Sequence, residues 1–141
     1  MKSYMKKNGF SLIELMMTVA VVGVLASISV PTYKNYSMKI KRSEGRSFAM
    51  EIMQRQEKFY NENNTYTTNL SQLGYNSSTP TSEKGYYKVT ATAASDGIAN
   101  NVIITAQPIG SQTSDTECGS FIYNSNGLKS TSTSSSTCWN K

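Results

Sequence analysis

The stretch FSLIELMMTVAVVGVLASISV, residues 10 to 30, is a long apolar run in which Glu14 is the only charged residue. This run decides how the chain is organised. As a helix that rises about 1.5 Å per residue, the stretch would cover roughly 31 Å, close to the hydrocarbon thickness of a bilayer. Ahead of it lie Lys2, Lys6 and Lys7 and no acid, which favours a cytoplasmic location for that end. The sequence therefore predicts a membrane span with the remainder of the chain on the outer side.

An ordinary secretory signal peptide is the plainer interpretation of this start, with cleavage near the small residues at 26–29. Glu14 argues against it, because a carboxylate costs on the order of 2.5–3.5 kcal/mol at a membrane centre and an export signal has no need for one. An acid in an apolar helix usually has a partner. The other alternative is that Glu14 only extends to the lipid headgroups.

Gly9 followed by Phe10-Ser11-Leu12-Ile13-Glu14 and an apolar helix resembles the prepilin signature of type IV pilins and related pseudopilins. The resemblance implies that a membrane-embedded aspartic peptidase cuts between Gly9 and Phe10 and methylates the new amino terminus of Phe10. It also implies that Glu14 faces the terminal amine of a neighbouring subunit. Two buried charges are costly alone and tolerable together, so this pair would favour subunits that meet in one axial register.

The length of the chain fits one long helix and one small domain. The predicted segments are a prepilin leader at 1–9, a transmembrane and filament-core helix at 10–30, an amphipathic continuation of the helix at 31–62, and a loop and antiparallel sheet domain at 63–141. Pro31 removes an amide donor, so a single helix from Ser11 to Glu62 should bend there. Two separate helices around the proline are the alternative.

The second part of the predicted helix is amphipathic, with apolar residues at spacings of three, four and seven. This apolar stripe consists of Phe48, Ala49, Ile52, Met53, Phe59 and Tyr60. Against the single acid Glu44, the first half of this part carries Lys34, Lys39, Lys41, Arg42 and Arg46. The basic residues predict contact with anionic headgroups, neighbouring subunits or nucleic acid, and a solvated helix face is the alternative.

Polar and small residues dominate positions 61–83, which predicts a long surface loop with one helical turn at 70–73. Four strand-like stretches follow, at 85–94, 101–107, 119–124 and 128–132. Asp96-Gly97 and Asn126-Gly127 favour tight turns between antiparallel strands. The apolar face of the sheet is predicted to consist of Tyr87, Val89, Ala91, Val102, Ile104 and Phe121. The expected fold class is α+β: the type IV pilin fold, a long N-terminal helix packed against a four-stranded antiparallel sheet.

Cys118 and Cys138 lie near the C-terminus, and their spacing is unlike that of a zinc site. In an exported chain they are expected to be oxidised to each other, and closing such a loop would stabilise the fold by about 3 kcal/mol. By resemblance this is the C-terminal disulfide loop of type IV pilins, the D-region, which lies on the filament surface. A redox-active pair is the alternative.

The sequence holds no histidine, and so no Ser-His or Cys-His set; it has no phosphate-binding glycine loop, and its acids are scattered singly, so we expect a structural protein and not an enzyme. No cofactor is expected. Asp115 and Glu117 leave a calcium-binding loop as an alternative, although two carboxylates are few for such a site.

Residues 59–75, FYNENNTYTTNLSQLGY, resemble the helix exit and loop of PilE-like minor pilins in type IVa systems. The expected function is that of a structural subunit, a minor pilin, of a type IV pilus that is assembled through its hydrophobic N-terminal helix and serves adhesion, twitching motility or DNA uptake.

The resemblance implies as partners the major pilin, other minor pilins, the prepilin peptidase and the assembly platform with its ATPase. It implies a single-pass inner-membrane protein with a periplasmic C-terminal domain, which then enters the extracellular pilus. A DNA-binding uptake receptor and a type II secretion pseudopilin are the alternatives. For DNA, the region of the disulfide offers only Lys129, Lys141 and the ring of Trp139.

Overall fold

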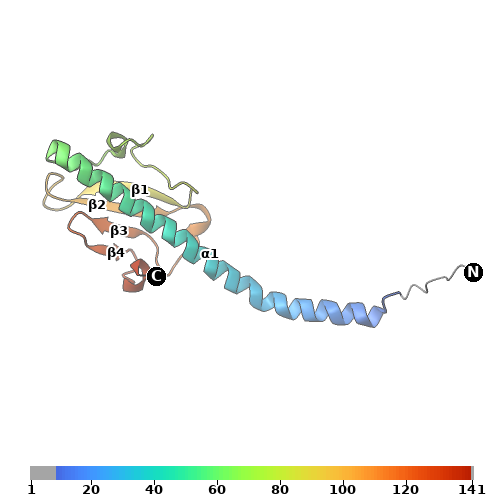
Figure 1. The fold of residues 1–141 in the computed structure, drawn as a ribbon. Coiled ribbons are helices and arrows are strands. Elements are labelled where there is room, and N and C mark those ends of the chain that lie inside the picture. Colours follow the sequence, from blue (N-terminus) through green and yellow to red (C-terminus); the bar gives the residue numbers. More distant parts are fainter. Residues whose placement is uncertain (1–8, 141) are drawn as a thin grey trace, which may run out of the picture. The chain divides into compact units, whose positions relative to one another are not determined.

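The computed structural model describes residues 9–140, so most of the predicted leader at 1–9 lies outside the described residues. A long helix precedes a four-stranded sheet (Figure 1). The elements are α1 (Leu12–Asn63), β1 (Tyr87–Ala93), β2 (Val102–Pro108), β3 (Phe121–Asn124) and β4 (Lys129–Thr131), with the short 3₁₀ helices η1 (Leu70–Leu73), η2 (Gly110–Ser114) and η3 (Ser136–Trp139). The chain divides into two compact units, with the boundary between Ser37 and Met38.

Helix α1 confirms the single continuous helix predicted from the sequence, and the alternative of two helices around Pro31 is wrong. Near its start, Leu15 N donates to Ser11 O at 3.1 Å. At its end, Asn64 adopts a left-handed conformation with φ +53°, and its N–H donates to Tyr60 O at 2.8 Å. A left-handed residue directs the chain away from the helix axis, which ends the helix at the point where the polar loop begins.

The sheet is an antiparallel meander with strand order β1-β2-β3-β4. Its register pairs Val89 with Ala106, Ile104 with Tyr123, and Phe121 with Thr131. All four predicted strands are present, each within a few residues of its expected bounds, and the predicted turn at 70–73 is η1. The β-branched and aromatic content of these stretches was therefore sufficient to locate the strands.

Only one of the two predicted tight turns is tight. Between β3 and β4, Asn124 N donates to Leu128 O at 3.1 Å, and Gly127 has φ +83°, a conformation that glycine adopts without steric cost. Between β1 and β2, residues 94–101 form a longer loop. There Asn100 and Asn101 both donate backbone N–H groups to Gly97 O, so consecutive turns replace a two-residue hairpin.

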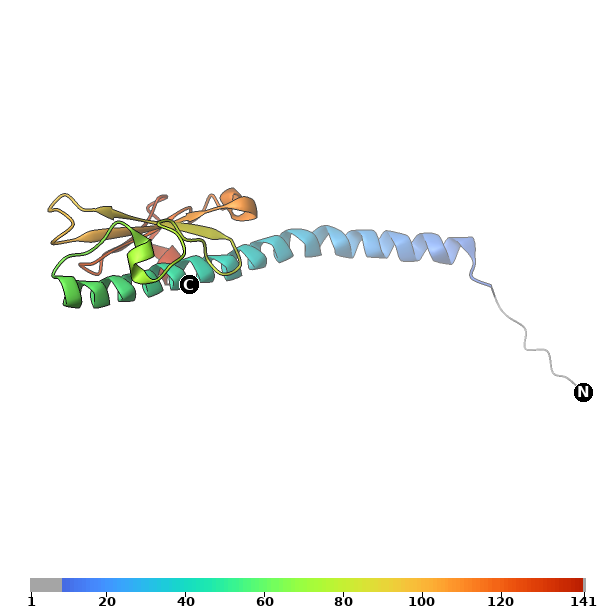
Figure 2. The ribbon, with the colours of Figure 1, turned by 90° about the horizontal axis from the view of Figure 1, so that it is seen from above.

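In the unit from Met38 onward, the core lies between α1 and one face of the sheet (Figure 2). Every residue of the predicted apolar face of the sheet is buried: Tyr87, Val89, Ala91, Val102, Ile104 and Phe121. From the predicted helix stripe, Ala49, Ile52 and Met53 are buried, and the three aromatic residues pack partly buried against them. The packing of helix on sheet is therefore as the periodicity predicts.

Three further helix residues are buried that the apolar stripe does not include, namely Arg42, Gly45 and Gln56. Gly45 lies beneath the Tyr87 ring: a Cβ at position 45 would be 2.8 Å from three ring atoms. Gln56 binds the loop after the helix, since its Nε2 donates to Thr67 O at 2.6 Å and its Oε1 accepts from Thr67 N at 3.1 Å. The buried amide of Gln56 is thus satisfied by backbone atoms of the loop.

Candidate functional site

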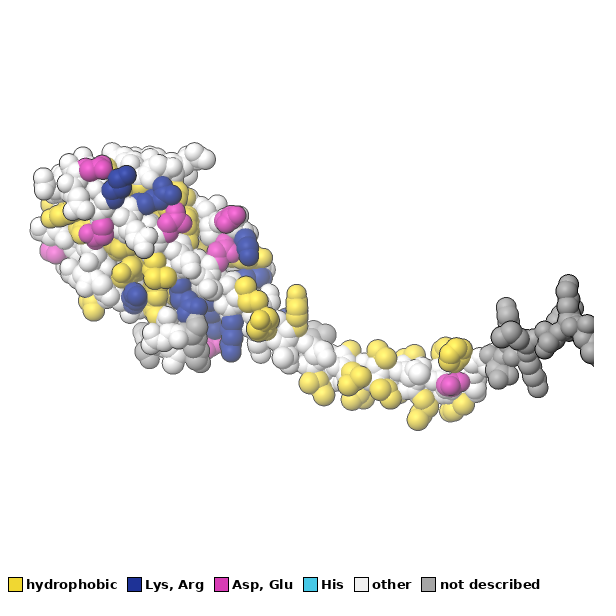
Figure 3. All heavy atoms as spheres, in the orientation of Figure 1, with side chains coloured by type: hydrophobic (Ala, Val, Ile, Leu, Met, Phe, Trp, Pro, Cys, Tyr) yellow, Lys and Arg dark blue, Asp and Glu magenta, His cyan; other side chains and the backbone are white. Residues whose placement is uncertain are grey.

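The first candidate site is the start of the chain, in the unit that ends at Ser37. Gly9 and Phe10 precede α1, and Phe10 is 83% exposed. Glu14 lies in the first turn of the helix, where unpaired N–H groups favour a negative charge. Side chains from Phe10 to Ser29 are all exposed, and most are apolar (Figure 3). Such a surface needs lipid or another protein to cover it.

Among the described residues, α1 is the one helix long and apolar enough to cross a membrane. Gly9, Phe10 and Glu14 therefore lie together at the end of a potential membrane span. The structure shows their accessibility but holds no neighbouring subunit. The cleavage, the methylation and the pairing of Glu14 consequently stay predictions.

The second candidate site surrounds the disulfide in the other unit. Cys118 and Cys138 are bonded, with a Cα–Cα distance of 5.8 Å, which confirms the predicted pairing. Cys118 lies just before β3 and Cys138 lies in η3, so the bond attaches the C-terminal turn to the start of β3. Trp139 adds to this attachment, because its Nε1 donates to Ser130 O at 2.7 Å and its ring packs edge-on against Phe121.

A buried ion pair lies beside the disulfide. Arg42 Nε and Nη2 donate to the two carboxylate oxygens of Asp115, each at 2.6 Å, and Arg42 Nη1 donates to Glu117 Oε2 at 3.0 Å. The Asp115 side chain is fully buried. Gln112 Nε2 donates to Asp115 Oδ2 at 3.1 Å and to Tyr87 Oη at 3.2 Å. The guanidinium fork of the helix thereby holds the loop that leads into the disulfide.

Electrostatics keep Asp115 ionised. Burial opposes its charge, but the hydrogen bonds from Arg42 and from the Cys118 and Glu117 N–H groups outweigh burial and lower the pKa of Asp115 below its ordinary value. Both carboxylates of the considered calcium loop therefore bind a guanidinium that the chain itself supplies. No cluster of three or more metal-ligating side chains occurs among residues 9–140.

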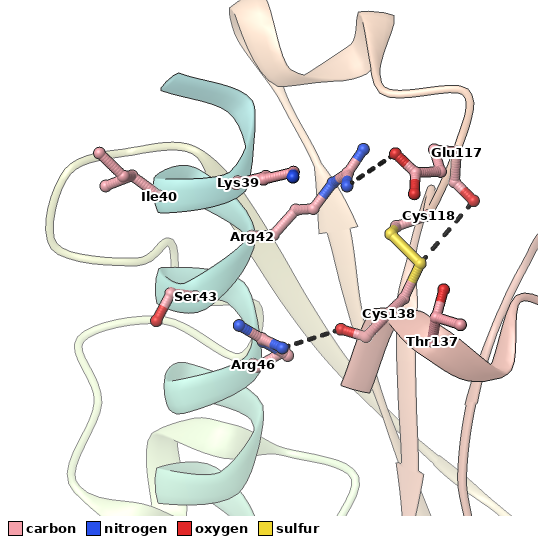
Figure 4. A pocket seen from close by; sticks show the side chains of 9 residues that line it. All are labelled: Lys39, Ile40, Arg42, Ser43, Arg46, Glu117, Cys118, Thr137 and Cys138. Carbon is pink, nitrogen blue, oxygen red and sulfur yellow. Dashed lines mark hydrogen bonds and ion pairs between the residues drawn. A yellow bond between two sulfur atoms is a disulfide. The ribbon is translucent and has the colours of Figure 1, made fainter. Parts of the chain in front are cut away.

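Arg46, one turn further along α1, has a different environment (Figure 4). Its Nη1 donates to Cys138 O at 2.9 Å, and no carboxylate of the described residues forms an ion pair with it. Burial lowers the pKa of Arg46; the interaction with Tyr87 opposes this shift, and repulsion from Arg42 adds to it. Arg46 lines a pocket of about 250 Å³ to which both cysteines of the disulfide also contribute. It also lines a recess of about 290 Å³, together with Lys129 and Trp139.

The basic residues predicted to act as one group have separate roles. Arg42 and Arg46 bind the disulfide loop, and Lys41 donates to Ser111 Oγ at 2.9 Å and lies over the Tyr86 ring. Lys34 and Lys39 are exposed. The alternative that these basic residues form a solvated helix face therefore applies to Lys34 and Lys39 but not to the other three.

The apolar stripe predicted for the helix does not include Arg42, Gly45 and Gln56, whose burial therefore was not predicted. The available signal was the heptad spacing, since Arg42, Ala49 and Gln56 recur every seven residues. A second series with the same spacing runs through Gly45, Ile52 and Phe59. Polar residues that continue an apolar heptad are candidates for buried, hydrogen-bonded positions.

Two family models match adjoining parts of the chain. One, described as the prokaryotic N-terminal methylation motif, matches residues 4–30. The other, described as type IV minor pilin ComP, DNA uptake sequence receptor, matches residues 31–122, more than half of the chain. Together they cover the long helix, the loop after it, β1, β2 and the first two residues of β3.

Individual proteins show the same likeness. The type IV major pilin protein PilA of Myxococcus xanthus is 30% identical over 67% of this chain and 42% of its own length. The type IV major pilin protein PilE1 of Neisseria gonorrhoeae is 31% identical over 68% of this chain and 63% of its own length. The chain thus spans less than two thirds of either relative. A type IV pilin from Shewanella oneidensis shares the fold, with a TM-score of 0.53, 18% identity, and coverage of 72% of this chain and 97% of that one.

Proposed function

The chain belongs to the family of ComP-type type IV minor pilins, and we propose that it is a minor subunit of a type IV pilus, assembled through its apolar N-terminal helix. The observation that carries this proposal is the exposed apolar surface from Phe10 to Ser29, interrupted only by the charge of Glu14. Lipid would cover this surface before assembly, and the helices of other subunits would cover it in the fibre.

The proposed order of segments is the leader at 1–9, the span at 10–30, its amphipathic continuation at 31–62 and the loop and sheet domain at 63–141. The protein would reside in the inner membrane as a single span, with the sheet domain in the periplasm, and then in the extracellular pilus. The disulfide between Cys118 and Cys138 agrees with an oxidising compartment. The proposed partners are the prepilin peptidase, the assembly platform and its ATPase, the major pilin and other minor pilins.

Maturation is proposed to occur between Gly9 and Phe10, with methylation of Phe10. Both residues are exposed and precede the regular helix, so the peptide bond is not protected by helical hydrogen bonds. Among residues 9–140, no heavy atom beyond those of Gly9 and its chain neighbours lies within 4 Å of a Cβ placed on Gly9. Mass spectrometry of the mature chain should therefore find Phe10 at the amino terminus. Gly9→Leu should block cleavage, with Gly9→Ala as the milder control, and normal maturation of the leucine variant would contradict the assignment.

Glu14 is proposed to pair with the terminal amine of Phe10 on an adjacent subunit. Glu14→Ala should insert in the membrane at least as well as the wild type, because a lone carboxylate is costly in an apolar environment. The variant should be processed at Gly9 and accumulate in the inner membrane, while its amount in sheared fibres falls. An equal amount in fibres, with an unchanged ratio to the major pilin, would show that Glu14 does not set the register.

A second candidate function is DNA capture at the fibre surface. It is favoured by the description of the matching family as a DNA uptake sequence receptor and by the recess that Arg46, Lys129 and Trp139 line. Sheared fibres that contain the chain should bind duplex DNA in a salt-dependent manner, and Lys129→Ala should reduce the salt slope by about 1. Lys84→Ala removes an exposed charge elsewhere and serves as the control. Equal binding by fibres that lack the chain would exclude this function.

Family membership favours a pilus over a type II secretion pseudopilus, which was the remaining alternative. A structural role is what the family implies. That the chain has no enzymatic activity and no cofactor stays a prediction from its composition.

A further inference from the structure

The pocket beside the disulfide combines an apolar floor with a cationic edge (Figure 4). Ile40 and the bond between Cys118 and Cys138 line it, together with the side-chain stems of Lys39, Arg42 and Arg46. Long basic side chains commonly cover apolar surface with their stems while the charged groups stay accessible. With a volume of about 250 Å³, the pocket has the size of one or two side chains.

Arg42 and Arg46 both border this pocket, but their charges are not equally satisfied. Arg42 binds two carboxylates, those of Asp115 and Glu117. Arg46 is partly buried, and of its five N–H groups one donates to Cys138 O, while no carboxylate in the described part of the chain pairs with it. A partly desolvated guanidinium without a counterion favours a single oxyanion that accepts from its free N–H groups.

On the side of this pocket, the surroundings of Arg46 favour a carboxylate from a protein over a phosphate of nucleic acid. An apolar floor adds nothing to phosphate binding, whereas it can bury an apolar side chain next to the acid. Glu117 also lines the pocket with a side chain that is 55% exposed, and its negative charge would repel the many phosphates of a polyanion more strongly than a single carboxylate. Lys39, exposed at the edge, supplies a second cation for one acidic side chain.

We propose that this pocket is a docking site for an adjoining pilus subunit, which inserts an acidic side chain toward Arg46 and a neighbouring apolar side chain against Ile40 and the disulfide. The proposal rests on the proposed function, because a fibre subunit must contact its neighbours outside the membrane span as well. The partner is recognised by its chemistry: an exposed Asp or Glu beside an aliphatic or aromatic residue.

The test uses intact pili from cells that produce the full chain with a photo-reactive residue in place of Ile40. Irradiation should give a cross-link to another pilin, and mass spectrometry should place it on a peptide that contains an Asp or Glu. The same probe in place of Gln54, exposed on the same helix outside the pocket, is the control and should give no such product.

Arg46→Gln should lower the cross-link yield roughly tenfold, the loss expected for one charge-assisted hydrogen bond, while Arg46→Lys should retain part of it. Lys39→Gln should lower the yield by a smaller factor. Because Lys39 is exposed, this variant should fold and can test the docking site even if Arg46→Gln impairs folding. Lys58→Gln removes one exposed charge from the same helix and should change nothing.

Suppose that the chain with the probe at position 40 and no other change is present in the fibres. If it then forms no cross-link, or a cross-link to DNA alone, the docking site is overturned and the pilus function is left intact. Unchanged yields in both Arg46→Gln and Lys39→Gln would also overturn it. Absence of the wild-type chain from fibres would overturn the pilus function and the docking site together.

Discussion

Arg42 on α1 and Asp115 before β3, 73 positions apart in the sequence, form a buried ion pair in which both carboxylate oxygens accept from one guanidinium at 2.6 Å. The pair connects the helix to the loop that leads into the disulfide. Breaking a buried pair leaves a charge without its partner in a region of low dielectric, which is more costly than losing the same contact at the surface.

Asp115→Asn should therefore destabilise the sheet domain by about 3–5 kcal/mol, because it leaves the Arg42 charge without its main counterion. Arg42→Gln should have a similar effect. The measurement is chemical unfolding of the purified full chain in detergent, followed by tyrosine and tryptophan fluorescence. The exposed pair of Arg55 and Glu51 on the same helix provides the control, and Glu51→Gln should cost no more than about 0.5 kcal/mol. Equal losses of unfolding free energy in Asp115→Asn and Glu51→Gln would show that the buried ion pair stabilises the domain no more than the exposed one does.

Stability should also depend on acid pH through Asp115. Its pKa is lowered in the folded state from an ordinary value of 3.8, so its contribution is fully present above that value and is lost as pH falls toward the folded pKa. The thermal midpoint of the wild type should fall as the pH is lowered below about 4, and that of Asp115→Asn should change less over the same range. Parallel curves for the two proteins would assign the acid sensitivity to other carboxyl groups.

Gly45→Ala should destabilise the domain by on the order of 1 kcal/mol. The added methyl group would meet the Tyr87 ring, which is fully buried, and overpacking costs about 1–3 kcal/mol, of which up to about 1 is offset by the better helix propensity of alanine. Gly23→Ala on the same helix is the matched control, because among the described residues its added carbon meets no heavy atom within 4 Å apart from its chain neighbours and the adjacent helix backbone. Thermal unfolding of both variants tests this, and an equally stable Gly45→Ala would mean that the ring moves aside freely.

Reduction of the disulfide should release the C-terminal turn before the rest of the domain unfolds. The bond between Cys118 and Cys138 closes a loop that contains the two shortest strands, and its loss should cost about 3 kcal/mol. Hydrogen exchange of the reduced chain should increase first in β4 and η3, while β1 and β2 stay protected. Uniform loss of protection across the sheet would contradict this order. In protein from intact cells, the two cysteines should resist alkylation.

The sequence by itself determined the secondary structure, the fold class and the buried face of the sheet. The apolar run at 10–30, the heptad stripe through Ala49 and Ile52, and the β-branched strands each depend on local periodicity, and burial followed that periodicity. The motif from Gly9 to Glu14 likewise indicated the family, which the matching models show.

Only the tertiary structure decided which polar residues enter the core and which cation is left without a carboxylate. Arg42 and Arg46 lie one turn apart and look equivalent in the sequence, yet the loop before β3 brings Asp115 and Glu117 to Arg42, and the turn at η3 brings only a backbone carbonyl to Arg46. Likewise, Asp96-Gly97 favoured a tight turn that became a longer loop. The physical reason is that the environment of a polar side chain depends on partners distant in sequence, which no local pattern records.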